Sequence, residues 1–457
     1  MPLKKAGIHW FLTDEEVAVA RNELDDLRKT ADYEPDKWCL SGLNRKPEAL
    51  GLALPDHMPK KVLVRDITLR TAEQASGVIL SHEDRLRLLR ALLEVGITSF
   101  ELTYFARQRA DELREQVDLI RRVNPDAEIE AGQITTVESI DLMASIGANL
   151  VSIKCPPCFA TAPLRPGAEV PKAAWEGKDW RTLARPPMNI KELAARNRSL
   201  IQHAEKRGMK TCAYLSSLNY ATPEFIEEYT YEMTRAGVHS ILLGDGPGAT
   251  APHGFAYAVS IIKRIAPEMK VVIHAHNSFN LGVARCLAGV HAGADVVEVS
   301  INGAGSYAGQ VDLAHVAAAL ELLYRVDTGL KLDQFTALRR LGEEVFGYPV
   351  SRDHSITGER YFTPEDTLIN FDPWIHTSVE PAIFGNRAIP FFSQKADVWD
   401  MAEKLTELNI PVEKPEVEAI LKEVKAELIA RKREPTDEEI RATALRVKTQ
   451  MTGQING

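Results

Sequence analysis

The chain has 457 residues and a formal net charge of −9, with apolar and charged fractions typical of a globular protein. No basic block or stripe stands out, so the composition argues against nonspecific nucleic-acid binding. The start, MPLKKAGIHWFLTDEEVAVA, has no continuous apolar run, and five cysteines in so long a chain do not make a disulfide framework. No later apolar run approaches a membrane span, so we expect a cytoplasmic protein with neither a membrane nor a nucleic-acid partner.

Three regions follow one another along the chain. Residues 1–60 predict a helix, TDEEVAVARNELDDLRKTA, and an irregular arm, typical of a packing or dimerisation extension. Residues 61–325 alternate short β-branched runs with longer segments of helical period. Residues 326–457 read as a mostly helical C-terminal subdomain, whose charges at spacings of three and four indicate a solvated helical surface.

The middle region contains eight strand candidates. They are KVLVRDIT (61–68), ITSFELT (97–103), AEIEAG (127–132), NLVSIK (149–154), KTCAYL (210–215), HSILLGD (239–245), KVVIHAH (270–276) and DVVEVSI (295–301). Amphipathic segments such as 82–96, 223–237 and 281–293 lie between them and end in a glycine that can cap a helix. Strands spaced by single helices require a parallel sheet, so the sequence predicts an α/β fold with a closed (β/α)8 TIM barrel, with a doubly wound open sheet as the alternative.

Catalytic groups of such a barrel lie at the C-terminal ends of its strands. The polar residues that interrupt the apolar runs there are Arg70, Glu101, Asp245, His274, His276 and Asn302. The loop at 155–189 is rich in proline and too long for a simple connector. We therefore expect it to form a lid or wall over the barrel mouth.

His274 and His276 occur in VVIHAHNSFNLG, at the end of the seventh strand candidate. They share one face of an extended strand because side chains alternate with period two. At about 7 Å apart by strand rise, two imidazoles can converge on one ion. The pair alone leaves a core or loop role as open as a role in metal binding.

Three segments together resemble the superfamily of isopropylmalate synthase, homocitrate synthase and HMG-CoA lyase, which are pyruvate-carboxyltransferase-like TIM-barrel metalloenzymes. RDITLRTAEQ is similar to its D-T-T-L-R-D-G-E-Q, HAHNSFNLG to its H-x-H-N-D-x-G, and NGAGSYAGQVDL (302–313) to its N-G-x-G-x-x-x-G-x-x-x-L. The tail from RAIPFFSQKADVW onward resembles the post-barrel subdomain of the synthases. The layout is thus most similar to homocitrate, isopropylmalate, citramalate or Re-type citrate synthases.

The resemblance implies a divalent metal (Mg²⁺, Mn²⁺ or Co²⁺) that polarises the keto group of a 2-oxo acid, with acetyl-CoA as the carbon nucleophile. His274 and His276 match its two imidazole ligands, and Asn302 matches a weaker asparagine ligand. Arg70 matches an arginine that stabilises the oxyanion. Glu101 matches the glutamate that orients this arginine.

Two further positions correspond to proton-transfer groups of the superfamily. His376, in DPWIHTSVEP, matches a subdomain histidine that acts as proton donor or acceptor. Tyr214, in TCAYLSS, stands where the synthases carry a glutamate that assists proton transfer. We therefore expect both to act in catalysis.

Several positions depart from the superfamily pattern. Thr71 replaces the ligand aspartate after the arginine, and a hydroxyl is a poor substitute for a carboxylate on a hard cation. Asp66 lies four residues earlier, about 13 Å along a strand, and cannot replace it. Ser278 replaces the aspartate of H-x-H-N-D. The ion is therefore expected to bind weakly, to use water or Asp245, or to be absent.

Other residues receive weaker interpretations. Cys155 and Cys158 form one C-x-x-C, a weak signal for a redox pair or a soft-metal half-site. Tyr307 and Gln310 read as scaffolding of the glycine-rich loop. The expected substrate contacts are Gln74, Thr71, Asp245 and Asn277.

The resulting prediction is a homodimeric acyltransferase that adds an acetyl group from acetyl-CoA to a 2-oxo acid and hydrolyses the thioester. The acceptor could be 2-oxoisovalerate, pyruvate, 2-oxoglutarate or oxaloacetate, and the departures favour an atypical acceptor such as oxaloacetate. Two alternatives stay open: a lyase or aldolase that runs the reverse cleavage, and a noncatalytic barrel that binds a metabolite or partner.

Overall fold

The computed structural model describes residues 31–41, 58–102, 110–134, 136–155, 190–216, 218–362, 377–388 and 392–455, and isolated residues 15, 18, 19, 22, 25, 28, 29, 44, 176, 177 and 374. The chain divides into a larger compact unit, Ala53–Val350, and a smaller unit made of Met1–Leu52 with Ser351–Gly457. The larger unit extends past the boundary at 325 expected from sequence because helix α12 (Phe335–Phe346) packs against α3 (His82–Val95).

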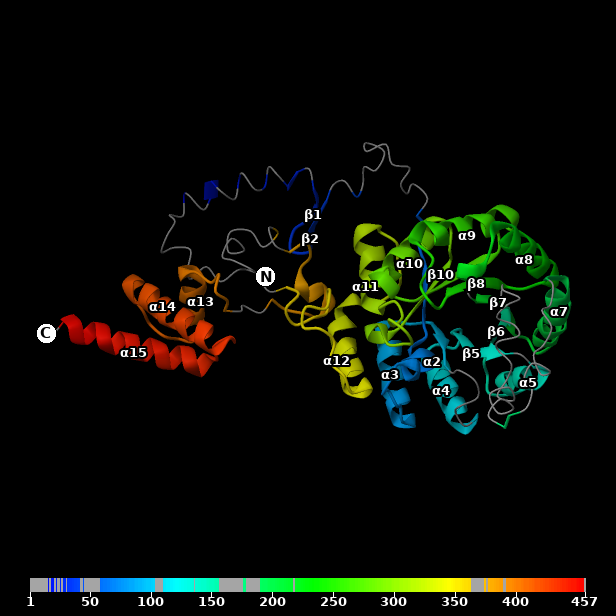
Figure 1. The fold of residues 1–457 in the computed structure, drawn as a ribbon, viewed down its shortest axis with the longest axis horizontal. Coiled ribbons are helices and arrows are strands. Elements are labelled where there is room, and N and C mark those ends of the chain that lie inside the picture. Colours follow the sequence, from blue (N-terminus) through cyan, green and yellow to red (C-terminus); the bar gives the residue numbers. More distant parts are fainter. Residues whose placement is uncertain are drawn as a thin grey trace. The chain divides into compact units, whose positions relative to one another are not determined.

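The larger unit is a closed barrel of eight parallel strands, in the order β10-β3-β4-β5-β6-β7-β8-β9 (Figure 1). The strands are β3 Leu63–Asp66, β4 Ser99–Glu101, β5 Glu128–Ile134, β6 Leu150–Cys155, β7 Lys210–Ser216, β8 Ser240–Asp245, β9 Lys270–Ala275 and β10 Val296–Val299. Each falls within or overlaps one of the eight candidates, so the predicted TIM barrel is confirmed and the open sheet is wrong.

Helices surround this barrel and follow the strands in sequence (Figure 1). They are α2 Thr68–Thr71, α3, α4 Ala110–Val123, α5 Val137–Ser145, α7 Ile190–Lys206, α8 Pro223–Ala236, α9 Pro252–Ile265, α10 Gly282–His291, α11 Leu313–Ala318 and α12. Local signals explain their ends: Ser81 and Asp84 form a capping box before α3, and Gly96 ends that helix with a φ of 104°. Short helical turns continue several of them: η4 Ala72–Gln74, η6 Leu218–Tyr220, η7 Ser278–Asn280, η8 Ile301–Gly303, η9 Ala319–Leu323 and η10 Leu332–Gln334.

The barrel interior changes from apolar to polar along the strands. Its apolar layer contains Leu150, Cys212, Leu242, Val272 and Val296. Two residues beyond Val296, Glu298 meets Arg65 of β3, whose Nη1 donates to Glu298 at 3.3 Å and to Glu130 at 2.9 Å. The C-terminal half of the barrel is therefore built from charged side chains that neutralise one another, which prepares this end for polar chemistry.

Strand β3 ends at Asp66, two residues earlier than the sequence predicts. The Asp66 carboxylate accepts hydrogen bonds from Thr68 N at 2.9 Å and Thr68 Oγ1 at 2.7 Å, which starts the helical turn α2. Asp66 thus lies at the C-terminal end of its strand rather than deep in the barrel. The expected separation of about 13 Å between Asp66 and Arg70 was wrong, because the chain between them is not an extended strand. The Asp66 carboxylate nevertheless already accepts two hydrogen bonds from Thr68.

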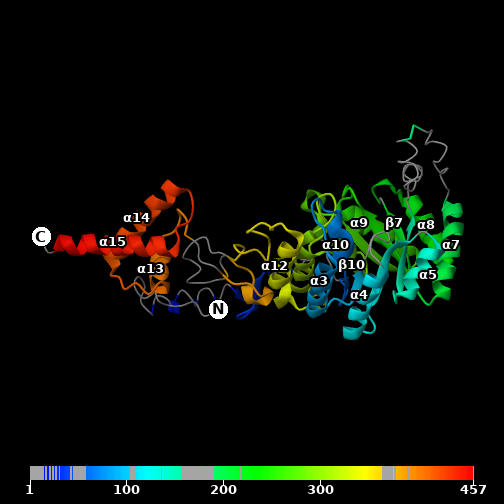
Figure 2. The same cartoon turned by 90° about the horizontal axis from the view of Figure 1, so that it is seen from below.

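The smaller unit contains the hairpin β1 Asp32–Glu34 and β2 Trp38–Leu40, the turn η13 Pro381–Phe384 and the helices α13 Val398–Glu407, α14 Lys414–Arg431 and α15 Asp437–Ile455. The three helices lie together in both Figure 1 and Figure 2 and bury residues such as Met401, Leu405 and Ile420. Among the described helices, none is both long and apolar enough to cross a membrane.

Candidate active site

Arg70 and Glu101 form a buried ion pair at the C-terminal ends of neighbouring strands. Arg70 lies on α2, directly after β3, and Glu101 is the last residue of β4. Arg70 Nε donates to Glu101 Oε2 across 2.7 Å. Burial raises the pKa of the Glu101 carboxyl, and the Arg70 guanidinium opposes that rise. Because arginine stays protonated, the Arg70 guanidinium is a fixed positive charge at this end of the barrel, paired with Glu101.

His274 and His276 point to the same side of β9, as the alternation of strand side chains predicts. Their ring centroids lie 5.2 Å apart, and both side chains are buried. His274 Nδ1 lies 2.7 Å from Glu298 Oε2, and His276 Nδ1 lies 3.4 Å from Ser306 O. A carboxylate and a carbonyl only accept hydrogen bonds, so each Nδ1 carries a hydrogen.

Electrostatics keep His276 neutral. Burial lowers the pKa of His276 to about 3, and the charges of His274 and Arg70 add to this effect. The action of Arg70 on His276 also shows that the ion pair and the imidazoles belong to one site. A neutral imidazole with a bare Nε2 is the form that binds a metal or accepts a hydrogen bond.

Gln310 brings its side-chain amide to both imidazoles. Its Nε2 lies 3.2 Å from Nε2 of His276 and 3.4 Å from Nε2 of His274. Gln310 is 1% exposed, and within the described part of the chain its Oε1 has no hydrogen-bond partner. The amide NH2 can donate one hydrogen to each imidazole, whereas the buried oxygen calls for a partner that the protein does not supply.

The loop after β10 fixes the position of Gln310. Left-handed backbone occurs at Asn302, Gly303, Tyr307 and Gly309. Gln310 N donates to Gly303 O at 2.9 Å, which folds the loop back on itself. Asn277 N donates to Gly309 O at 2.9 Å, which ties the loop to the segment after β9. A Cβ at Gly309 would collide with Gly303 O, so this fold requires glycine there.

Asn302 does not join the imidazoles, in contrast to the expected ligand role. Its Nδ2 donates to Arg339 O on α12 at 2.9 Å, and its side chain lies against Gly342. The φ of 55° at Asn302 is left-handed, so the chain leaves the strand direction at this residue. Gln310 is instead the amide that faces His274 and His276.

Two expected substrate contacts lie after β3. Thr71 is fully buried, and its Oγ1 lies 3.1 Å from Ile67 O and 3.0 Å from Ala304 O, so its hydroxyl is committed to backbone carbonyls. Gln74 is half-buried, and its Oε1 accepts from Ser306 Oγ at 3.5 Å. Both residues therefore brace the loop that carries Gln310.

Two others stabilise loops at the same end of the barrel. Asp245 Oδ1 accepts from Gly248 N at 3.1 Å and its Oδ2 accepts from Thr250 N at 2.5 Å. Asn277 Oδ1 accepts from Gly282 N at 3.2 Å at the start of α10. These contacts hold the Asp245 carboxylate in place, and its expected role in place of the missing ligand carboxylate stays a prediction.

Tyr214 lies on β7 beside the imidazoles. Its ring centroid is 6.0 Å from that of His274 in an edge-on arrangement, and its ring packs against Gly244 of β8. Tyr214 thus lies beside His274, and its expected role in catalysis stays a prediction. His376, the side chains of Cys155 and Cys158, and most of the 155–189 loop lie outside the described residues, so those expectations stay predictions.

The donor set can be tested against the expected ion. Two ligands held at right angles about 2.1 Å from one ion lie about 3 Å apart, close to the separations between the Gln310 amide and the imidazoles. A half-turn of the amide would place the orphaned Oε1 beside His274 and His276. These three donors fit a divalent ion, although nowhere in the described ranges do three or more His, Cys, Asp or Glu side chains form an ion site.

Comparison with known proteins finds distant relatives of the chain. The HMGL-like family profile matches residues 183–341. The chain is 27% identical over 391 residues to a putative (R)-citramalate synthase of Methanopyrus kandleri, which covers 84% of this chain and 72% of the relative. It is 29% identical to a 2-phosphonomethylmalate synthase of Streptomyces rubellomurinus, which covers 68% of this chain and 77% of the relative. The chain is a distant homologue of the HMGL-like superfamily.

A solved structure supports the fold of this chain. The HMG-CoA lyase of Bacillus subtilis superposes with a TM-score of 0.54 at 18% identity, over 66% of this chain and 98% of the lyase. At that identity the similarity supports the barrel fold alone.

Two residues of this site were not assigned from the sequence. Gln310 was interpreted as scaffolding, and Glu298 was not singled out. The signal for Glu298 is its place on the same face as Val296 in VVEVS, inside an otherwise apolar strand. A buried polar residue that interrupts such a strand is informative even without a motif.

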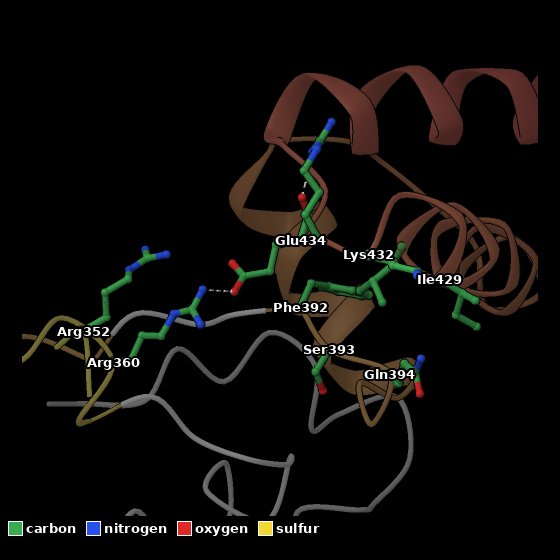
Figure 3. A pocket seen from close by; sticks show the side chains of 10 residues that line it. Arg352, Arg360, Phe392, Ser393, Gln394, Ile429, Lys432 and Glu434 are labelled. Atoms are coloured by element: carbon green, nitrogen blue, oxygen red, sulfur yellow. Dashed lines mark hydrogen bonds and ion pairs between the residues drawn. The ribbon is translucent and has the colours of Figure 1, made fainter. Parts of the chain in front are cut away.

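A separate cavity of about 660 Å³ lies in the smaller unit of this chain (Figure 3). Its lining includes four cations, of which Arg352 pairs with Glu359, Arg360 with Glu434, and Arg433 with Glu439. Because these charges are largely balanced, the cavity shows no built anion site. All its lining residues belong to the smaller unit, whereas the imidazoles belong to the barrel.

Proposed function

We propose that the chain catalyses an acetyl-CoA-dependent condensation with a 2-oxo acid. The supporting observation is that the Arg70–Glu101 ion pair and the imidazoles of His274 and His276 lie at the C-terminal end of the barrel, where the charge of Arg70 acts on His276. The names of the relatives, a citramalate synthase and a 2-phosphonomethylmalate synthase, support the same reaction class.

In this reaction a proton leaves the acetyl methyl group, and the resulting carbon attacks the keto carbon of the acceptor. The keto oxygen becomes a hydroxyl, and water then cleaves the thioester to release free CoA thiol and a carboxylate. Arg70 would stabilise the negative charge that develops on the keto oxygen, because a buried guanidinium acts strongly where water is excluded. Glu101 would orient Arg70 through its hydrogen bond to Nε.

His274, His276 and Gln310 would hold a divalent ion. When bound, such an ion supplies Lewis-acid polarisation of the keto group. Glu298 would keep the His274 Nδ1 protonated and its ring in place. Tyr214 and His376 are the proposed proton-transfer groups. The oxaloacetate acceptor, cytoplasmic location and homodimeric assembly expected from the sequence are part of the proposal.

The test is release of free CoA thiol from acetyl-CoA with each of several 2-oxo acids and with Mg²⁺, Mn²⁺, Co²⁺ or Zn²⁺. We expect release with one acid, a large loss in His274→Ala and full activity in the matched control His253→Ala, which changes an exposed histidine on α9. A folded protein that releases no thiol with any acid and any ion would exclude the condensation. Formation of acetyl-CoA from a hydroxyacyl thioester would instead indicate the reverse cleavage.

A further inference from the structure

The donor set around Gln310 contains nitrogen and amide groups but no carboxylate. His274, His276 and Gln310 are 2%, 4% and 1% exposed, so the three groups are protected from solvent. Each imidazole is held in one orientation by a partner on Nδ1, Glu298 for His274 and Ser306 O for His276. Both Nε2 atoms are therefore prepared for a ligand before it arrives.

The described carboxylates around these donors have other partners. Glu101 pairs with Arg70, Glu298 pairs with Arg65 and His274, and Asp245 accepts from two backbone N–H groups. Thr71, on the turn after β3, offers only a hydroxyl committed to carbonyl oxygens. No described side chain thus brings a negative oxygen to the Gln310 amide.

This composition determines which ions the site accepts. Mg²⁺ takes oxygen ligands, prefers carboxylates and gives up water reluctantly. Imidazole suits Co²⁺, Ni²⁺ and Zn²⁺, whose affinity for nitrogen ligands exceeds that of Mn²⁺. Two imidazoles and an amide therefore offer little to Mg²⁺ and a good partial shell to the borderline ions.

We infer that this barrel binds a borderline divalent ion such as Co²⁺ or Zn²⁺ through His274, His276 and Gln310, and that the uncharged amide of Gln310 makes the site reject Mg²⁺. The ion's use in turnover rests on the proposed condensation, whereas ion binding does not. Gln310 is the residue that decides the selectivity, because a carboxylate of the same length would put a negative oxygen in the same place. The orphaned Oε1 of Gln310 is the atom that gains a partner when the ion binds.

The experiment measures binding directly, on the full chain freed of metal with a chelator. Calorimetry with Co²⁺, Zn²⁺, Mn²⁺ and Mg²⁺ gives the affinities, and visible absorption of the Co²⁺ form reports nitrogen coordination without any substrate. For the wild-type protein we expect one Co²⁺ per chain, bound at least about 100-fold more tightly than Mg²⁺. His274→Ala and Gln310→Leu should each weaken Co²⁺ binding, and circular dichroism checks that both variants fold.

The sharper variant is Gln310→Glu. We expect it to raise Mn²⁺ and Mg²⁺ affinity at least about 10-fold while Co²⁺ affinity changes less, because hard ions gain most from a carboxylate. Gln202→Glu adds the same charge at an exposed position of α7 and should leave all affinities unchanged.

Three results would overturn the inference: sub-millimolar Mg²⁺ binding by the wild-type protein, equal gains for all ions in Gln310→Glu, or no ion binding by folded protein. Each of these is separable from failure of the condensation. Thiol release supported by Mg²⁺ would confirm the proposed function and contradict the selectivity. Selective Co²⁺ binding without thiol release would confirm the selectivity and contradict the proposed function.

Discussion

Glu298 Oε2 lies 2.7 Å from His274 Nδ1, and both side chains are buried inside the barrel. The other carboxylate oxygen accepts from Arg65 Nη1, so the imidazole is anchored through Glu298 to the charged layer of the interior. This arrangement fixes the tautomer of His274 and makes its Nε2 more basic. The structural layer beneath the site therefore also controls the chemistry of the site.

Glu298→Gln should weaken Co²⁺ binding by about 10- to 100-fold, because the amide keeps the shape but loses the charge that strengthens the imidazole. Calorimetry on folded protein checks this. Glu321→Gln replaces another partly buried carboxylate, one that accepts from Thr328, and should leave Co²⁺ affinity unchanged. Equal Co²⁺ affinity of Glu298→Gln and the wild-type protein would show that Glu298 serves packing alone.

Glu101→Gln should lower the free energy of unfolding by about 3–5 kcal/mol, because it leaves the buried Arg70 charge without a carboxylate. Urea unfolding measures the change. The double variant Arg70→Met with Glu101→Gln removes both charges and should recover much of the loss. If the double variant is less stable than Glu101→Gln, then an uncompensated charge is not the cause.

Asp66→Asn should gain stability relative to the wild-type protein as the pH rises. Burial raises the pKa of Asp66 to about 7, from the ordinary aspartate value of 3.8 that applies in the unfolded chain. A raised carboxyl pKa means that the wild-type protein is favoured below about pH 4 and loses that stability as the pH approaches 7.

Between pH 5 and pH 8 the difference in free energy of unfolding should therefore move in favour of Asp66→Asn by about 2–3 kcal/mol. Urea titrations at pH 5, 6.5 and 8 measure it. The exposed substitution Asp118→Asn provides the baseline. A difference that is flat with pH would contradict the effect of burial on Asp66.

Gly244→Ala should disturb Tyr214, because a Cβ at Gly244 would lie 2.5 Å from Tyr214 Cε2 and 2.8 Å from its hydroxyl. We expect a loss of about 1–3 kcal/mol in the free energy of unfolding and reduced thiol release. Gly246→Ala is the matched control, since its Cβ would lie 3.6 Å from the nearest atom, Tyr307 Cε2, an ordinary contact. Equal behaviour of the two variants would rule out the steric effect.

Much of the barrel was predictable because buried parallel strands leave a clear pattern. Runs such as KVVIHAH are apolar on both faces and alternate with helical segments that end in glycine. The same period-two rule placed His274 and His276 on one side of β9. The Arg70–Glu101 pair was accessible through resemblance, because both residues match positions of the superfamily pattern.

The loop after β10 was not predictable in this way. Once Asn302 adopts a left-handed φ, the direction of each later side chain depends on the folded loop and not on strand alternation. The sequence therefore favoured Asn302 over Gln310 as the amide near the imidazoles. The early end of β3 was missed for a similar reason, since Thr68 is β-branched yet begins a helical turn on Asp66.

In the loop that carries Gln310, the backbone holds the fold and the Gln310 side chain faces the imidazoles, which protein engineering can use. Backbone hydrogen bonds to Gly303 and from Asn277 hold the loop, and none of them involves the Gln310 side chain. A library at position 310 alone can therefore sample new chemistry without redesigning the loop, provided that Gly309 is kept.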